Sequence, residues 1–322
     1  MNIKIISLVI VIVLLINIKN SKACNVCGGG TSDIAVLALD GRMLFNMGFM
    51  YDHYLGIWDQ NGKWRESDFT TNQYKIAVAI AYRINKHFQF GITVPYVFNT
   101  SSNTGLKQSG SSVGDLSVSA RYELFHEFQL RKSGSKKKID NLYPYLAFIF
   151  GITIPTGKSD ETAKNEVDVT GKGFYSTSLG ISVIKSIIKN RFQMSADLSW
   201  QHSFTNKYET YFGSSASFTK QAGDKFNYSM TVNYIFGSEH AVSLTATGFN
   251  QSAYLINDNV ANNSDERSFN FILAYTYYPH IQFRITPSVK WTFPSNNFGR
   301  NATGSTTFNI NFTYYIPDYS IK

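Results

Sequence analysis

The sequence is poor in charged residues and has almost no cysteine. Only 16% of its 322 residues are Asp, Glu, Lys or Arg, whereas soluble domains carry about a quarter. Two cysteines cannot staple a chain of this length, which excludes a disulfide-rich scaffold. Only one long apolar run exists, at the N-terminus, and this argues against a helical membrane protein. Aromatic residues make up 15% of the chain, which excludes intrinsic disorder.

The N-terminal apolar run predicts an export signal. Residues 5–16 are almost entirely apolar, and Ser21 and Ala23 supply the small residues of a cleavage site before Cys24. The run is shorter than the roughly 20 residues that span a bilayer as a helix. We therefore expect residues 1–23 to be a signal peptide. An uncleaved anchor and a lipoprotein lipidated at Cys24 are the alternatives, and all three export the chain.

Export changes the meaning of the positive charge. The full chain has a formal net charge of +8, and residues 1–23 hold three lysines and no acid, so the mature chain carries +5. Much of this excess lies in one basic run at 131–138. Nucleic acid is not an expected partner of an exported protein, so a solvated turn is the preferred interpretation of this run.

The remainder of the chain alternates between apolar and polar residues with a period of two, which is typical of β-strands that separate two environments. In 281–293 one face is Ile, Phe, Ile, Pro, Val, Trp and Phe, and the other is polar. Most segments are long enough for the roughly 9–11 residues that a tilted strand needs to cross a bilayer. Twelve such segments are predicted, at 43–57, 72–84, 87–98, 113–127, 142–155, 173–186, 190–203, 225–236, 239–251, 267–278, 281–293 and 304–315.

The connections between these segments also alternate in length. Tight turns follow even-numbered segments, and long polar connections follow odd-numbered ones, which is the pattern of an outer-membrane barrel with periplasmic short turns. The connection at 128–141 is the exception. Lipid leaves no water for an open sheet edge, so the sheet must close. The fold class predicted is all-β, an antiparallel up-and-down barrel of twelve strands over residues 42–322; a soluble sandwich or lipocalin-like protein is the alternative.

Four stretches, at 91–98, 113–122, 144–157 and 170–180, resemble motifs of a known family. This is the outer-membrane transporter group named for the MetA pathway of phenol degradation, and the similarity is best over roughly residues 88–186. The resemblance implies an outer-membrane barrel that passes small, often aromatic or hydrophobic molecules. It supplies no catalytic or binding residue.

Charged residues on the polar faces of the predicted strands are the candidate site residues. A Lys or Arg facing lipid near the midplane costs about 2–4 kcal/mol, so the polar face must be the lumen. These residues either line a path or pair across it; pairing is slightly favoured. The candidates are Lys75, Arg83, Asp115, Arg121, Glu123, Asp197, Arg284 and Lys290.

Enzymatic activity and a bound cofactor are not expected. His202 falls on the apolar face without a partnered serine motif, and the sequence has no P-loop and no His-rich metal motif. Cys24 and Cys27 are candidates for a disulfide or a metal site, and Cys24 alone for lipidation. Residues 24–41 are expected to form a periplasmic tether or a plug.

Together these patterns predict a passive channel or transporter for small molecules in the outer membrane of a Gram-negative bacterium. The competing hypothesis is a structural or surface-interaction barrel that displays the loops 156–172, 204–224 and 252–266. In the longest loop, Tyr208, Tyr211 and Phe212 would then form a ligand-entry lip or an adhesive patch. The expected partners are outer-membrane lipid, a small solute and the barrel-assembly machinery during biogenesis, but no nucleic acid.

Overall fold

The computed structural model describes residues 41–67, 70–103, 106–124, 130–133, 136–139, 144–188, 191–237 and 239–317. Among these residues no helix is long and apolar enough to cross a membrane. Strands account for most of them, together with a single 3-10 turn, η1(Glu166–Asp168).

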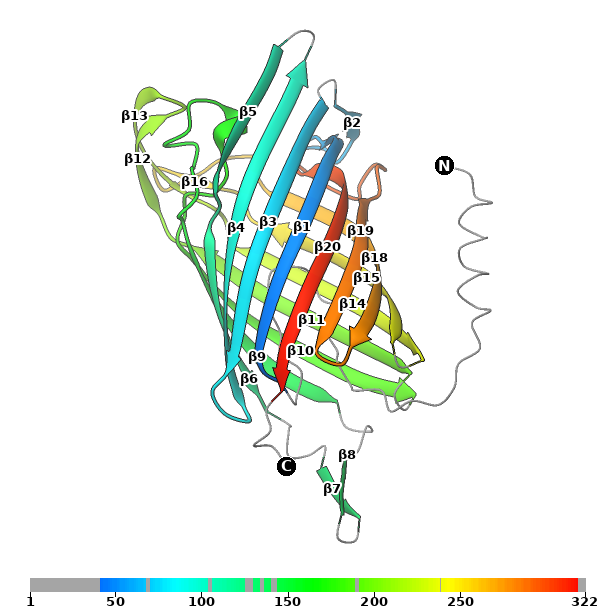
Figure 1. Cartoon of the computed structure of the whole chain (residues 1–322). Helices are drawn as coiled ribbons and strands as arrows, with labels where there is room; N and C mark the ends of the chain where they lie inside the picture. Colours follow the sequence, from blue (N-terminus) through cyan, green and yellow to red (C-terminus); the bar gives the residue numbers. More distant parts are fainter. Residues whose placement is uncertain are drawn as a thin grey trace, which may run out of the picture.

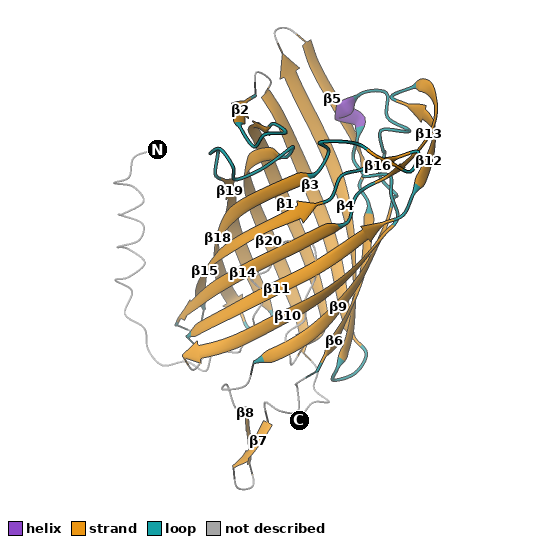
Figure 2. Ribbon diagram, turned by 180° about the vertical axis from the view of Figure 1, so that it is seen from behind, coloured by secondary structure: helices purple, strands orange, loops and turns teal. Residues whose placement is uncertain are grey.

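Twelve antiparallel strands close into one barrel (Figures 1 and 2). The first strand, β1, pairs with the last, β20, on one side and with β3 on the other, so the wall has no free edge. This confirms the predicted fold class, and each predicted segment corresponds to one strand of the wall. The wall strands are β1(Gly41–Trp58), β3(Thr70–Arg83), β4(Phe88–Asn103), β6(Leu116–Glu123), β9(Tyr145–Ile154), β10(Ser176–Ile188), β11(Phe192–Ser203), β14(Lys225–Phe236), β15(His240–Gln251), β18(Glu266–His280), β19(Phe283–Thr292) and β20(Thr303–Pro317).

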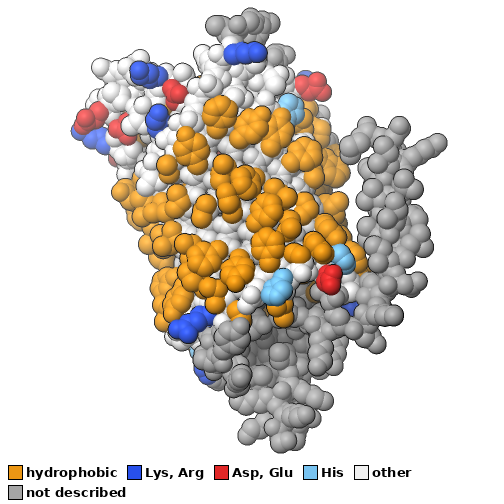
Figure 3. All heavy atoms as spheres, viewed as in Figure 1, with side chains coloured by type: hydrophobic (Ala, Val, Ile, Leu, Met, Phe, Trp, Pro, Cys, Tyr) orange, Lys and Arg blue, Asp and Glu red, His pale blue; other side chains and the backbone are white. Residues whose placement is uncertain are grey.

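The outer face of the barrel is apolar. Along β1, Phe45, Met47 and Phe49 are 38–42% exposed, whereas the intervening Gly48 is buried and Asn46 is half-buried. Figure 3 shows the result on one face: hydrophobic side chains form a broad band, and most charged side chains lie above or below it. Exposed Phe, Ile and Tyr in this number would be unfavourable in water, whereas lipid solvates them. The alternation therefore separates a lipid-facing surface from a lumen.

Additional strands lie beyond the wall at both ends. At the end with the long connections they are β2(Trp64–Glu66), β5(Leu106–Val113), β12(Asn206–Tyr211), β13(Ser214–Gln221), β16(Leu255–Ile256) and β17(Asn259–Val260). At the opposite end, the basic run forms a separate hairpin from β7(Leu130–Ser133) and β8(Lys136–Ile139) (Figure 1).

Two of the predicted loops are more ordered than the sequence suggests. The connection at 99–112 is largely strand, because β4 continues past the wall and pairs with β5 from Tyr96↔Val113 to Asn103↔Leu106. The connection at 204–224 holds the hairpin β12–β13, which joins β16 and β17 in a four-stranded sheet, hereafter the loop sheet. Strands made of polar residues can form a hairpin as well as strands made of apolar residues can. Such strands show no alternation of apolar and polar residues, so the sequence does not reveal them.

Candidate functional site: the lumen and its extracellular mouth

A buried ionic cluster occupies the lumen near the short-turn end. Nη1 of Arg83 lies 2.7 Å from Oε2 of Glu123, and both side chains are fully buried. Gln89 donates a hydrogen bond to the same carboxylate. Arg121 lies close by, with its Nε 3.9 Å from Oε1 of Glu123 and its Nη2 donating to Ser182 at 3.3 Å. One carboxylate thus serves two guanidinium groups, and Arg83 also fixes the turn after β3, because it donates to the carbonyl oxygen of Lys86.

A second charge pair lies higher in the lumen. Nζ of Lys290 is 3.8 Å from Oδ1 of Asp52, and Thr307 and Ser305 donate hydrogen bonds to that oxygen. The three strands that hold these residues, β19, β20 and β1, are consecutive in the wall, and Thr307 is in register with both Lys290 and Asp52. Asp52 is not among the predicted site residues. It lies on the polar face of its strand, so the alternation of apolar and polar residues could have identified it as a lumen residue.

The other predicted lumen residues have different surroundings. Asp197 accepts a hydrogen bond from Ser229 at 3.1 Å, and the guanidinium of Arg284 lies 5.0 Å from the ring centre of Tyr315. Lys75 is half-buried and is in register with Met50 of β1. Asp115 precedes β6 instead of lying in it. Its carboxylate accepts hydrogen bonds from the backbone N–H groups of two residues in the 156–172 loop, and so anchors that loop at the mouth.

Several predictions fall on parts of the chain that the structure does not describe. Cys24, Cys27, the signal peptide at 1–23 and the plug or tether at 24–40 all lie outside the described residues. Within the described ranges, no group of three or more His, Cys, Asp or Glu side chains is placed to hold a metal ion.

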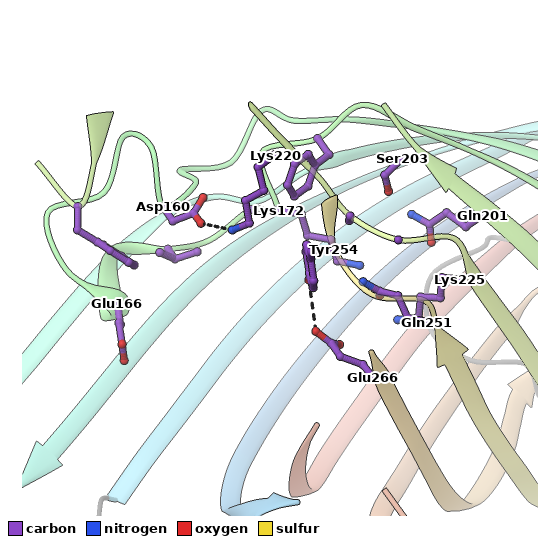
Figure 4. Close-up of a pocket in the computed structure, with 16 residues that line it drawn as sticks. Asp160, Glu166, Lys172, Gln201, Ser203, Lys220, Lys225, Gln251, Tyr254 and Glu266 are labelled. Atoms are coloured by element: carbon purple, nitrogen blue, oxygen red, sulfur yellow. Dashed lines mark hydrogen bonds and ion pairs between the residues drawn. The ribbon is translucent and has the colours of Figure 1, made fainter. Parts of the chain in front are cut away.

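A cavity of about 500 Å³ lies at the extracellular mouth, between the strand ends and the loops (Figure 4). Its floor consists of inward-facing residues near the ends of four adjacent strands: Gln201, Lys225, Gln251 and Glu266. Its roof and sides come from the loops, with Asp160, Lys172, Phe174, Phe212, Lys220 and Tyr254 among the lining residues. Such a volume suits a small organic solute.

The loop sheet has an apolar core of its own. Phe174, Tyr208 and Ala222 are buried, and Phe218 and Tyr254 pack against them. The sequence places Tyr208 in an exposed lip or adhesive patch. This is wrong for Tyr208, which is fully buried because its ring stacks on Phe218 at 4.9 Å. Tyr211 is exposed and Phe212 lines the cavity.

Lys220 is the polar centre of this assembly. Its Nζ lies 2.6 Å from Oδ2 of Asp160, and four aromatic rings surround it with centres at 5.5 to 6.0 Å. These rings belong to Phe174, Tyr208, Tyr211 and Tyr254. The hydroxyl of Tyr208 donates to the other oxygen of Asp160 at 2.9 Å. Figure 4 shows the ion pair at one side of the cavity and the Tyr254–Glu266 hydrogen bond at another.

Burial controls the ionisation of two of these tyrosines. Burial and the neighbouring carboxylate of Asp160 raise the pKa of Tyr208 far above its ordinary value. Burial and the charge of Glu266 raise the pKa of Tyr254 to about 12. Both hydroxyls therefore remain protonated donors at any physiological pH.

His202 has a partner that the sequence does not reveal. Its Nδ1 is 2.7 Å from Oδ1 of Asp224, and Nε1 of Trp200 donates to the other carboxylate oxygen at 3.3 Å. The sequence does contain a signal, since His202 lies just before the predicted 204–224 loop and Asp224 is the last residue of that loop. The stacking of His202 on Trp200 at 5.8 Å fits the expected interfacial role at the rim of the apolar band.

Solved structures of other barrels resemble this one to different degrees. The structure superposes on an outer membrane channel from Pseudomonas putida F1 with a TM-score of 0.68 and 13% identity, over 91% of this chain and all of the other. The translocator domain of the autotransporter NalP from Neisseria meningitidis gives 0.49 at 10% identity, over 85% and 88% of the two chains. The transport unit of the autotransporter AIDA-I from Escherichia coli gives 0.47 at 8%, over 85% and 90%. A search of curated protein sequences gives no significant match.

The closed wall and its apolar band confirm the bacterial outer membrane as the location of the protein. A family profile described as "Putative MetA-pathway of phenol degradation" matches residues 81–308, which is most of the chain and most of the barrel. The chain therefore belongs to the family of the putative MetA pathway of phenol degradation.

Proposed function

We propose that the protein is a passive outer-membrane channel for small molecules. The observation that supports this most strongly is the continuity between the mouth cavity and the lumen: the floor of the cavity is formed by inward-facing residues of the wall strands themselves. A solute in the cavity is therefore already in contact with the lumen wall. Lys75, Arg284, Lys290 and Asp197 are proposed to lie along the path, whereas Arg83, Arg121 and Glu123 hold the wall near the periplasmic turns.

The test is ion conductance of the purified protein in planar lipid bilayers. A channel gives discrete, reproducible current steps, and a heat-denatured sample of the same protein gives none. Absence of steps from the folded protein, both for the full mature chain and after deletion of residues 24–40, would contradict the proposal. Steps that arise only after the deletion would assign a plug role to that segment and retain the channel.

A structural or display role is the second candidate. The loop sheet with its buried core supports it, because the outward loops are ordered by their own packing. Catalysis has no comparable support: His202 and Asp224 lie on the outer surface, and no serine hydroxyl is hydrogen-bonded to the histidine among the described residues. Absence of conductance from the folded protein, together with loss of cell adhesion when residues 206–221 are removed, would favour the display role over the channel.

A further inference from the structure

One side of the lumen is a continuous polar surface. It covers the inward-facing positions of β11, β14, β15 and β18 over four successive register rows, hereafter the polar wall. The outermost row is the cavity floor already described. The next row holds Ser199, Asn227, Phe249 and Ser268, and the third holds Asp197, Ser229, Thr247 and Asn270. The fourth row is Ser195, Thr231, Thr245 and Ile272.

The polar wall faces the lumen, because the residues between or next to its members face lipid. Leu198, Trp200 and Met230 lie between members, and Leu244 and Leu273 lie directly next to one; all five are 42–57% exposed on the outer surface. Every member of the wall apart from Phe249 and Ile272 carries a hydroxyl, amide, ammonium or carboxylate group. The outermost and fourth rows are six residues apart on each strand, so the surface extends roughly 20 Å along the strands from the mouth.

The opposite side of the lumen has a different composition. In the strand order, β4, β3 and β1 lie across the barrel from the polar wall. Midway along these strands the inward positions include the small residues Gly48, Ala77, Ala79, Ala81 and Gly91, whereas Asn46, Asp52, Lys75, Arg83 and Thr93 on the same strands are polar or charged. Polar residues therefore lie on both sides of the lumen, and the small residues midway along the opposite strands leave room beside the polar wall.

Hydrogen bonds within the polar wall do not exhaust its capacity. Asn227 donates to Ser199 at 3.3 Å, Ser229 donates to Asp197 at 3.1 Å, and the hydroxyls of Thr231 and Thr245 are 2.8 Å apart. Thr247 donates to the carbonyl oxygen of Tyr228 at 3.2 Å; Asn270 donates to Ser268 at 3.3 Å and accepts from Thr292 at 2.6 Å. A primary amide offers two donors and an acceptor, and a hydroxyl offers one donor and two acceptors. The amides of Asn227 and Asn270 and the hydroxyl of Thr247 therefore have more donor and acceptor positions than these bonds occupy, and they face the lumen.

This chemistry selects against hydrocarbon solutes. An apolar molecule pressed against the wall would remove water from these groups without replacing its hydrogen bonds, whereas a hydroxylated solute both donates and accepts in exchange. The charges in the wall have mixed signs, since Lys225 lies between Glu266 and Asp197, and its Nζ sits 3.6 Å from the ring centre of Phe249. This mixture of signs gives the wall no strong preference for an anion or a cation.

We infer that the solutes of this channel are small, uncharged, polyhydroxylated molecules of the polyol or monosaccharide class. They bind first in the mouth cavity and then along the polar wall. The inference rests on the proposed channel function and specifies its substrate class. It also differs from the aromatic or hydrophobic solutes that the family resemblance implies.

Current block in planar bilayers tests the inference with mannitol as the probe. Mannitol should reduce the potassium chloride current through single channels in a saturable manner. Triethylene glycol, which is of similar size but has only two hydroxyls, should act at much higher concentration, and benzyl alcohol should not block. Block by benzyl alcohol alone, or no saturable block by mannitol, would overturn the inference and leave the conductance and the channel intact. Absence of any conductance would overturn both.

Variants locate the binding surface. Thr247→Val combined with Asn270→Leu removes two polar groups of the wall with little change in shape, and the half-blocking concentration of mannitol should rise about ten-fold. Thr286→Val combined with Asn46→Leu makes the same chemical change in the lumen outside the wall, and should leave the block within about two-fold of wild type. Heat-dependent gel mobility verifies folding of each variant, and Thr247→Val alone serves if the double variant does not fold. Equal effects of the two pairs would contradict the assignment of the wall as the binding surface.

Discussion

Lys220 of the loop sheet and Asp160 of the loop after β9 form an ion pair at 2.6 Å inside a ring of four aromatic side chains. The two residues are 60 positions apart, and their side chains are only 20% and 16% exposed. The pair therefore links two separate loops over the mouth cavity. Its partial burial makes it stronger than a surface pair and makes either charge unfavourable without the other.

Loss of this pair should loosen the loop sheet without opening the barrel. Asp160→Asn leaves the ammonium of Lys220 without its carboxylate. Hydrogen bonds to a charged group contribute about 1.5–3 kcal/mol each to stability, and the substitution removes this charge. We expect trypsin to cleave within 206–221 several-fold faster than in wild type, while heat-dependent gel mobility remains the same. Glu209→Gln, which breaks only the exposed pair with Lys207 at 3.4 Å, is the control and should not change the cleavage rate.

The loop sheet should also lose stability at high pH. The folded protein raises the pKa of Tyr254 from 10.0 to about 12, and the pKa of Tyr208 also rises. Above pH 10 the unfolded loop loses these protons while the folded loop retains them, so the folded form is progressively less favoured between pH 10 and 12. Hydrogen exchange of residues 206–221 should accelerate over this interval. Tyr254→Phe should reduce the acceleration, and an unchanged pH profile in that variant would contradict this origin.

The buried cluster near the periplasmic turns should dominate the stability of the barrel wall. Glu123→Gln leaves Arg83 and Arg121 without a carboxylate, and breaking a buried pair in this way costs about 3–5 kcal/mol. The temperature at which the folded form is lost on gels should fall clearly. Arg65→Ala breaks the exposed pair with Asp59 and should change this temperature little. Similar shifts for both variants would show that burial is not the cause.

Ion selectivity should respond to the two positive lumen residues of β19. Arg284→Glu with Lys290→Glu replaces two positive side chains by negative ones and leaves Asp52 next to a second carboxylate. Pore-lining cations favour anions, so the reversal potential in a salt gradient should shift toward cation selectivity. Lys290→Gln alone should give a smaller shift of the same sign. A reversal potential equal to that of wild type would exclude these residues from the ion path.

Surface labelling should reveal the orientation of the barrel. Gly213, at the tip of β12–β13, has a positive φ of 75°, and a Cβ atom added there would meet nothing within 4 Å, so an inserted tag disturbs no packing. An epitope at this tip should be detected on intact cells. The same epitope after Gly237, in the short turn between β14 and β15, should be detected only after the outer membrane is permeabilised. The reverse result would invert the assigned topology.

Alternation in the sequence is sufficient to predict the wall but not the loops. All twelve wall strands are predictable because lipid on one side and a polar lumen on the other impose opposite demands on successive residues, as along Phe45, Asn46 and Met47. The loop sheet has no such contrast, since both of its environments are partly aqueous. In the sequence Tyr208 therefore resembles an exposed aromatic, and only its stacking on Phe218 shows it to be core.

The candidate site is predictable to a similar degree. The lumen-facing side of Asp197, Arg284 and Lys290 follows from periodicity alone. Their partners do not: Asp52 is 238 positions from Lys290 in the chain, and only the closure of the barrel brings β1 and β19 to either side of β20. The mouth cavity likewise is formed by loops that are far apart in the sequence. Local sequence patterns do not predict how these loops pack against one another.

The seam between β1 and β20 has a consequence for how the protein is made. Asn46 and Thr313, hydrogen-bonded across this seam, are 267 residues apart, so the last strand must be synthesised and exported before the first can find its partner. Until then both ends of the sheet are unpaired strand edges, which readily join other chains and aggregate. Contacts of such sequence separation also form slowly. A chain truncated before Thr303 should therefore fail to close at all, and its accumulation in the periplasm should make it a substrate for proteolysis.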